Sequence, residues 1–141
     1  MFTPTFARAS TAYKRVGAET SVQNANPHHL VHLLFEEFFQ CLSTAQGALE
    51  RKDIAVKGRA IGRAVRILEE GLKAGLNPEG GGELAVNLGR LYDYCVMQLT
   101  LANVRNDIAL VQEVRKVIDP IAKAWAEINP SAGATNQKVG A

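Results

Sequence analysis

The sequence predicts an all-α protein folded as an antiparallel four-helix bundle, and three observations predict that class. Apolar residues recur at helical spacing in four segments of about 20 residues each. Short connections separate these segments, and helices joined in this way pack as antiparallel neighbours. No stretch alternates apolar and polar residues between hairpin turns, as a strand would. A length of 141 residues with 47% hydrophobic composition fits one domain with its own core.

Residues 1–25 precede the first long periodic segment and contain only isolated apolar side chains. We expect a short helix near residues 5–16, followed by a loop to Asn26. Too few apolar side chains are present here to form a core, but Phe6, Tyr13 and Val16 are sufficient to cover a groove on the bundle. Two interpretations of residues 1–25 stay open: the segment packs permanently on the bundle, or it caps a groove there until a partner displaces it.

The bundle itself is predicted to span residues 26–128. Asn26 and Pro27 form a strong start signal, because an N-cap side chain is followed by proline at the first helical position. The first helix then runs to about Glu50. Its apolar arc is wide, and Leu33 and Phe39 lie outside it. The residues expected to be buried are Leu30, Val31, Leu34, Phe35, Phe38, Cys41, Leu42, Ala45, Ala48 and Leu49.

The second helix is predicted over residues 54–74, with Asp53 as its N-cap. Two cations, Arg51 and Lys52, suit the end of the preceding helix. The core positions of the second helix are Val56, Ala60, Ile61, Ala64, Val65, Ile67, Leu68 and Leu72. Its opposite face is largely basic, and we interpret it as solvated; it contains Arg59, Arg63, Arg66, Glu70 and Lys73.

A glycine-rich and proline-containing segment, residues 75–82, separates two helical hairpins. The third helix follows, and residues 84–104 carry two apolar stripes on roughly opposite faces. The first stripe, expected to face the core, contains Leu84, Leu88, Leu91, Cys95, Leu99 and Ala102, with Tyr92 at its edge. The second contains Val86, Met97, Leu101 and Val104, with Tyr94 at its edge. One stripe suffices to dock a helix on a core, so the second must be covered by another segment or by a partner.

The fourth helix is predicted to begin after Asp107, its N-cap, following a tight connection at residues 103–106. Pro120 lies inside this helix and should kink or locally open it. From Asn129 the chain is small, polar and poor in apolar residues, so residues 129–141 are expected to be a disordered tail. The core face of the helix contains Leu110, Val111, Val114, Val117, Ile118, Ile121 and Trp125.

The composition argues against several classes of function. A net charge of +2, from 16 basic and 14 acidic residues, gives no electrostatic argument for nucleic acid or an anionic membrane. No apolar run is long enough to span a bilayer, and the N-terminus lacks the apolar centre of a signal peptide. These features predict a cytoplasmic protein.

No catalytic or metal-binding constellation can be assembled from the sequence, so we expect neither an enzyme nor a cofactor. Cys41 and Cys95 lie on the apolar faces of their predicted helices, so we expect both to be buried thiols. His28, His29 and His32 cluster at a helix start, where His32 could face Glu36 one turn later, but they lack the Glu-x-x-His pairs of a bundle metal site. We interpret them as ordinary exposed histidines.

Several motifs, read in order, resemble one family. Tyr13 and a loop precede the helix NPHHLVHLLFEEF, a helix begun by Asp53 follows, and then comes GGELAVNLGRLYDYCVMQLTLAN. Asn106-Asp107, Glu113-Val114 and Trp125 complete the series, which resembles the FliS family of flagellar secretion chaperones. The family commonly has Tyr-Asp-Gly-Ala where this chain has Phe-Glu-Glu-Phe, at residues 35–38. Phenylalanine at position 35 lacks the tyrosine hydroxyl, and Glu37 is larger than the family's residue at its position. The resemblance therefore does not extend to a hydrogen bond from that ring or to close packing over position 37.

The resemblance implies a cytosolic chaperone for flagellin, which binds the disordered C-terminal segment of its client around the outside of the bundle. Such a chaperone prevents premature polymerisation, assists delivery to the flagellar type III export apparatus, and in some cases contacts other flagellar regulators. A four-helix-bundle signalling or phosphotransfer adaptor is the alternative, and it would depend on the histidine cluster. The candidate client-binding residues are Tyr13, Leu33, Phe39, Val86, Tyr94, Met97, Leu101 and Val104.

Overall fold

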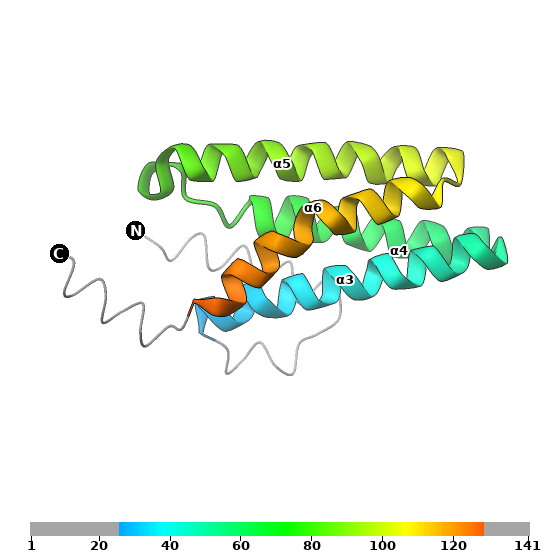
Figure 1. The fold of residues 1–141 in the computed structure, drawn as a ribbon, viewed down its shortest axis with the longest axis horizontal. Coiled ribbons are helices and arrows are strands. Elements are labelled where there is room, and N and C mark those ends of the chain that lie inside the picture. The colour runs from blue at the N-terminus through cyan, green and yellow to red at the C-terminus, as the bar shows by residue number, and fades with distance from the viewer. Residues whose placement is uncertain (1–25, 129–141) are drawn as a thin grey trace.

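The computed structural model describes residues 26–128, which form an antiparallel helical bundle (Figure 1). Its elements are α3 (Pro27–Arg51), α4 (Ile54–Arg66), the π-helix η1 (Ile67–Lys73), α5 (Pro78–Arg105) and α6 (Ile108–Glu127). Because η1 continues α4, the described part of the chain contains four helical rods and no strand. The predicted fold class is confirmed. The expected N-terminal helix and C-terminal tail lie outside the described residues.

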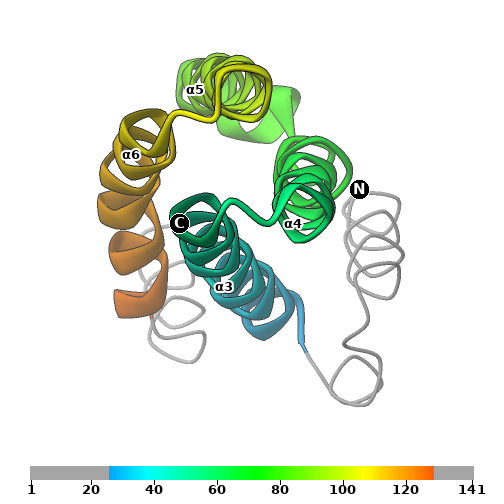
Figure 2. The same cartoon turned by 90° about the vertical axis from the view of Figure 1, so that its right-hand side faces the viewer.

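The four rods follow one another around the bundle (Figure 2). α3 packs against α4 and α6, and α5 packs against α4, η1 and α6. As a result, α3 and α5 occupy diagonally opposite corners. This placement decides which predicted site residues can meet.

The predicted helix starts are confirmed by their capping hydrogen bonds. The Oδ1 atom of Asn26 accepts from the backbone N–H of His29 at 2.7 Å, and Asp53 accepts from that of Val56 at 3.2 Å. Asp107 likewise accepts from the N–H of Ala109 at 2.9 Å. Each side chain satisfies a backbone donor that the first helical turn leaves without a partner.

The boundaries of α5 differ from the prediction. Asn77 caps a first turn that begins at Pro78, and Gly82 then leaves the helical region with φ 56° and ψ −134°. Only glycine adopts such a conformation without strain, so the helix bends here and resumes. At the other end, the predicted connection over residues 103–106 is wrong, because α5 continues to Arg105 and Asn106 alone turns left-handed with φ 52°.

The second helix also differs near its end, since its last turns are π-helical over η1 rather than α-helical to residue 74. Its core residues Ile67, Leu68 and Leu72 are nevertheless buried as predicted. α6 runs through Pro120, which lies on its exposed side.

The core fills the space between the four rods, and its largest fully buried side chains come from α3, η1, α5 and α6. They are Phe38, Leu30, Leu34, Leu42, Ile67, Leu68, Leu99, Ile118, Val111, Val114 and Cys95. Two residues predicted to face the core on the third helix do not: Leu84 is 67% exposed, and Leu91 is half-buried at the edge. The buried positions at that end of α5 are Ala85, Gly89 and Tyr92 instead.

Candidate binding surface

The outer face of α5, which we define as Val86, Tyr94, Met97, Leu101 and Val104, is open to solvent. Met97 is 62% exposed and Val104 is 74% exposed, while Val86 and Tyr94 are exposed to a lesser degree. Leu101 is half-buried between them. The sequence prediction that this second stripe lies off the core is confirmed, and residues 26–128 leave most of it, Met97 and Val104 above all, uncovered.

Two seven-residue repeats explain how one helix presents both a buried and an exposed apolar line. Ala85, Tyr92 and Leu99 are spaced by seven residues and buried. Met97 and Val104 are also seven apart, and both are exposed. A seven-residue spacing keeps side chains on one line of a supercoiled helix. α5 therefore has one line for the core and another with the same period facing outward.

Polar contacts border the outer face on both sides. Toward α6, the Tyr94 hydroxyl donates to the carboxylate of Glu113, and Gln98 Nε2 donates to the other oxygen of that carboxylate at 3.3 Å. The hydrogen bond to Glu113 raises the pKa of the Tyr94 phenol, which keeps it protonated as the donor. Toward η1, Lys73 Nζ pairs with Asp93 at 2.7 Å. These contacts fix the edges of α5 and leave its apolar centre free.

Leu33 and Phe39, the two predicted site residues on α3, do not join this face. Both are half-buried and packed against the core. Phe39 lies beside α6, where the guanidinium carbon of Arg115 is 5.6 Å from its ring centroid and Arg115 Nη2 donates to the Phe39 carbonyl at 3.3 Å. Since α3 and α5 are diagonally opposite (Figure 2), a partner must extend around the bundle to reach both sets. Tyr13 lies outside the described residues.

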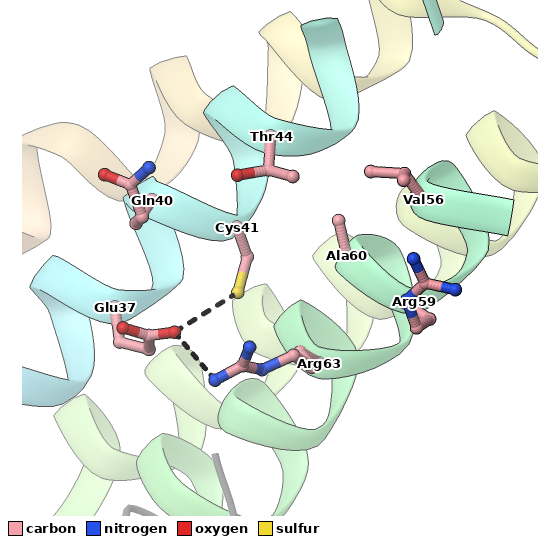
Figure 3. A pocket seen from close by; sticks show the side chains of 8 residues that line it. All are labelled: Glu37, Gln40, Cys41, Thr44, Val56, Arg59, Ala60 and Arg63. Carbon is pink, nitrogen blue, oxygen red and sulfur yellow. Dashed lines mark hydrogen bonds and ion pairs between the residues drawn. The ribbon is translucent and has the colours of Figure 1, made fainter. Parts of the chain in front are cut away.

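A groove of about 290 Å³ lies on the surface between α3 and α4, and residues of both helices line it (Figure 3). Glu37 bridges the two helices here. One of its carboxylate oxygens accepts from Arg63 Nη2 at 3.1 Å and lies 3.9 Å from the Cys41 thiol. The ion pair between Glu37 and Arg63 thus gives the groove a charged wall, and Val56 and Ala60 are part of its apolar lining.

The thiols are chemically quiet, as the sequence predicted. Burial, together with the nearby Glu37 carboxylate, raises the pKa of Cys41 to about 11. Burial and Glu113 raise the pKa of Cys95 to about 12. Both cysteines are free and protonated at neutral pH, so neither supplies the thiolate that a nucleophile requires.

One of the three clustered histidines, His28, joins two helices. His28 is half-buried and contacts Trp125, so the interpretation of three ordinary exposed histidines is wrong for this residue. His32 faces Glu36 at 3.2 Å, as its spacing indicated, and the ring of His29 lies on the ring of His32. Among residues 26–128, no group of three or more potential ligands can hold a metal ion. The adaptor alternative loses part of its basis, because one of its three histidines is committed to holding the bundle.

Lys57 is a buried structural residue that sequence reasoning missed. It is 6% exposed, and its Nζ donates to the carbonyl of Asn103 at 2.8 Å and to Oδ1 of Asn106 at 2.6 Å. The ammonium thus satisfies the C-terminal end of α5, where a cation is favoured. In the sequence, Lys57 is a lysine next to the apolar run of α4. A solvated lysine commonly has the same position, so the sequence did not indicate that Lys57 is buried.

The described bundle exposes an apolar face on α5, and an amphipathic partner helix can contact a surface of this kind. Within residues 26–128, each helix is too short or too polar to cross a membrane.

Comparison with known proteins shows the family of this chain. The family model described as flagellar protein FliS matches residues 9–132. The chain is 44% identical over 121 residues to the flagellar secretion chaperone FliS of Salmonella typhimurium, covering 86% of this chain and 90% of that protein. It is 41% identical over 122 residues to FliSB of Pseudomonas aeruginosa, covering 86% and 96%, and 36% identical over 127 residues to FliS of Escherichia coli, covering 89% and 93%. The chain belongs to the FliS family of flagellar secretion chaperones.

Proposed function

We propose that this chain binds the C-terminal segment of flagellin in the cytosol, prevents its premature polymerisation and assists its delivery to the flagellar type III export apparatus. Other flagellar regulators and export-apparatus components are further partners in this proposal. Membership of a flagellar secretion chaperone family supports it. The observation that carries it is the outer face of α5, an apolar line that the described part of the bundle leaves uncovered. The role is binding, without catalysis or a cofactor.

The binding mode follows from the chemistry of that face. An amphipathic helix placed along α5 would bury Tyr94, Met97, Leu101 and Val104, and each such side chain contributes about 1–2 kcal/mol when its exposed surface leaves water. A client that is disordered before binding must also become ordered, which opposes binding by several kcal/mol. One helix face therefore gives a moderate affinity, which favours a longer contact that continues to Leu33 and Phe39 on α3.

Residues 1–25 complete the proposal as an intramolecular cap. We infer that Tyr13 and its neighbours occupy the outer face until a client displaces them, which lowers the apparent client affinity. Deleting residues 2–12, or changing Tyr13→Ala, should then tighten binding. Weaker binding by both variants would instead assign Tyr13 to direct client contact, and unchanged binding would remove residues 1–25 from the site.

Isothermal titration with a flagellin C-terminal segment of about 40 residues tests the central proposal. Binding should show a large negative heat-capacity change, because coupled folding buries apolar surface. Met97→Asp should weaken binding by at least about tenfold, because it places a charge in the contact. The matched control is Gln112→Asp, which introduces the same group at an exposed position on α6. Absence of binding by the unmodified chain at high micromolar segment would refute the proposal.

A further inference from the structure

Arg90 interrupts the outer face of α5. It lies seven residues before Met97 and fourteen before Val104, so it occupies the same line of the helix. It is exposed, and no residue of the described 26–128 forms an ion pair or hydrogen bond with its guanidinium. An unpaired cation thus stands on the line of Met97 and Val104, next to the apolar part of that line and one repeat after the exposed Glu83.

A groove beside Arg90 extends the outer face toward η1. It has a volume of about 230 Å³, with Leu76, Ala85 and Val86 as its apolar lining. Three charged residues also line it, Lys73, Arg90 and Asp93. Since Lys73 and Asp93 pair with each other at 2.7 Å, their charges compensate and the positive charge of Arg90 remains. This end of the face is therefore apolar with one uncompensated cation.

We propose that the outer face of α5 binds a helical partner segment in a single register, fixed by an acidic side chain of that segment paired with Arg90. This inference rests on the proposed function and specifies the chemistry of the client. The acidic residue lies about two turns, close to seven residues, from the apolar residue that contacts Met97. That spacing is the same for either direction of the partner helix, because the line on α5 has a seven-residue period.

The energetics of desolvation explain why one charge can select a register. A partner in the matching register covers the guanidinium with a carboxylate, and charge-assisted hydrogen bonds replace the lost water. A shifted register places an apolar side chain over Arg90 and buries a cation without a partner. A single polar residue in an otherwise apolar seam selects register in coiled coils by the same means. The apolar positions thus provide affinity, and Arg90 provides alignment.

The experiment measures binding of the flagellin C-terminal segment to the full chain carrying Arg90→Glu, by titration at low and high salt. Arg90→Glu should weaken binding by about tenfold or more at low salt, and high salt should strengthen its binding, because salt screens the repulsion between the new glutamate and the acidic side chain of the segment. Arg66→Glu is the matched control, because Arg66 is exposed on α4 without a described partner. Its binding should stay within about twofold of the unmodified chain.

Charge reversal on the partner makes the test decisive. Each acidic residue of the flagellin segment is changed to lysine in turn, and one of these changes should restore binding to the Arg90→Glu chain while weakening binding to the unmodified chain. Arg90→Met should bind the original and the lysine-bearing segment equally well. Thermal unfolding of each variant confirms that it is folded.

Failure of this inference is distinct from failure of the proposed function. If the unmodified chain does not bind the segment, the proposed function fails. If it binds, Met97→Asp weakens binding and Arg90→Glu has no effect, the outer face is the site and the register inference is wrong. The inference is also wrong if Arg66→Glu weakens binding equally, or if no lysine change restores binding.

Discussion

Trp125 and His28 are joined by two reciprocal hydrogen bonds and a ring stack. Trp125 Nε1 donates to the carbonyl of His28 at 3.0 Å, and His28 Nε2 is 2.8 Å from the carbonyl of Trp125. The rings lie 4.9 Å apart and are nearly parallel, at 14°. Because a carbonyl only accepts, Nε2 must hold the ring proton in this contact. The pair ties the first turn of α3 to the last turn of α6 and closes one end of the bundle (Figure 1).

Shortening Trp125 should show what this closure contributes. Trp125→Phe retains a ring and removes the Nε1 donor, so we expect a loss of about 1 kcal/mol in the free energy of unfolding. Trp125→Ala also removes the packing and should lose about 2–3 kcal/mol, less than a fully buried tryptophan would, since Trp125 is half-buried. Urea titration measures both. Equal losses for the two variants would mean that the hydrogen bond, and not the ring, holds the helix ends together.

The contact between Lys57 and the end of α5 leads to a second prediction. Lys57→Met should cost about 1–3 kcal/mol, since it leaves the Asn103 carbonyl and the Asn106 side chain without their charged donor. Lys116→Met, at an exposed position on α6, is the control and should change stability by less than about 0.5 kcal/mol. Similar losses in both variants would contradict a capping role for Lys57.

Asn106 offers an independent check at the same turn. Its left-handed backbone, with φ 52°, disfavours a β-carbon, and its side chain accepts from Lys57. Asn106→Ala should therefore destabilise more than Asn106→Gly, because alanine loses the hydrogen bond and retains the strain. Urea titration of the two variants should separate them by about 1 kcal/mol. The reverse order would show that backbone conformation does not limit this turn.

Buried thiols predict a loss of stability at alkaline pH. The pKa of Cys41 rises from 9.0 to about 11 in the folded chain, and that of Cys95 from 9.0 to about 12. Above pH 9 the unfolded chain releases these protons while the folded chain retains them, so the free energy of unfolding falls as pH rises from 9 toward 11–12. Below pH 9 this contribution is fully present.

Comparing the chain with a Cys41→Ala, Cys95→Ala variant isolates the thiols from the tyrosines and lysines that also titrate there. Urea midpoints measured at pH 8, 9, 10 and 11 should fall more steeply for the unmodified chain. If the urea midpoint falls equally steeply with pH in both proteins, neither thiol has a raised pKa in the folded chain. A slow reaction of the native chain with a thiol reagent at pH 8 is expected for the same reason.

Local signals in the sequence were sufficient to predict most of the fold. Asn26, Asp53 and Asp107 each precede a helix and accept a hydrogen bond from its first turn, a relationship that depends only on residues two or three apart. The two faces of α5 also follow from spacing within one helix. These features could be predicted because no distant part of the chain determines them.

The error at Leu84 and Leu91 has a geometrical cause. A straight helix at 3.6 residues per turn drifts by about 20° per seven residues from a seven-residue repeat. Over the length of α5, the predicted core line therefore departs from the real one at the N-terminal end, where Ala85 and Tyr92 are buried instead. The path of the buried line along α5 depends on how the packed helices wind around one another. A helical wheel treats one straight helix alone and cannot include this effect.

Contacts between distant segments account for the remaining differences. Lys57 and Asn103 are 46 residues apart, and His28 and Trp125 are 97 apart. Nothing near these residues in the sequence indicates their partners. The same limit applies to the site, because Phe39 is on α3 and Met97 is on α5, and these two helices lie diagonally opposite (Figure 2). Sequence spacing identified which side chains are off the core, and topology decided which of them share a face.

The corrected faces of α5 lead to the last prediction, which compares substitutions only two residues apart. Leu99 is fully buried in the core, whereas Met97 is 62% exposed. Leu99→Asp places an unpaired charge inside the bundle and should lower the free energy of unfolding by about 4 kcal/mol or more, enough to unfold a marginally stable domain. Met97→Asp should change it by less than about 0.5 kcal/mol while weakening flagellin binding.

Leu91→Asp provides an intermediate point on the same scale. Leu91 is half-buried outside the core cluster, so its aspartate remains partly hydrated and the loss should be about 1–2 kcal/mol. Circular dichroism during urea titration gives the order of the three variants. An order of Leu99, Leu91 and Met97, from most to least destabilising, follows from the burial of the three side chains. If Leu91→Asp unfolds the bundle as completely as Leu99→Asp, the core line of α5 follows the straight-helix wheel and the seven-residue repeat is not its determinant.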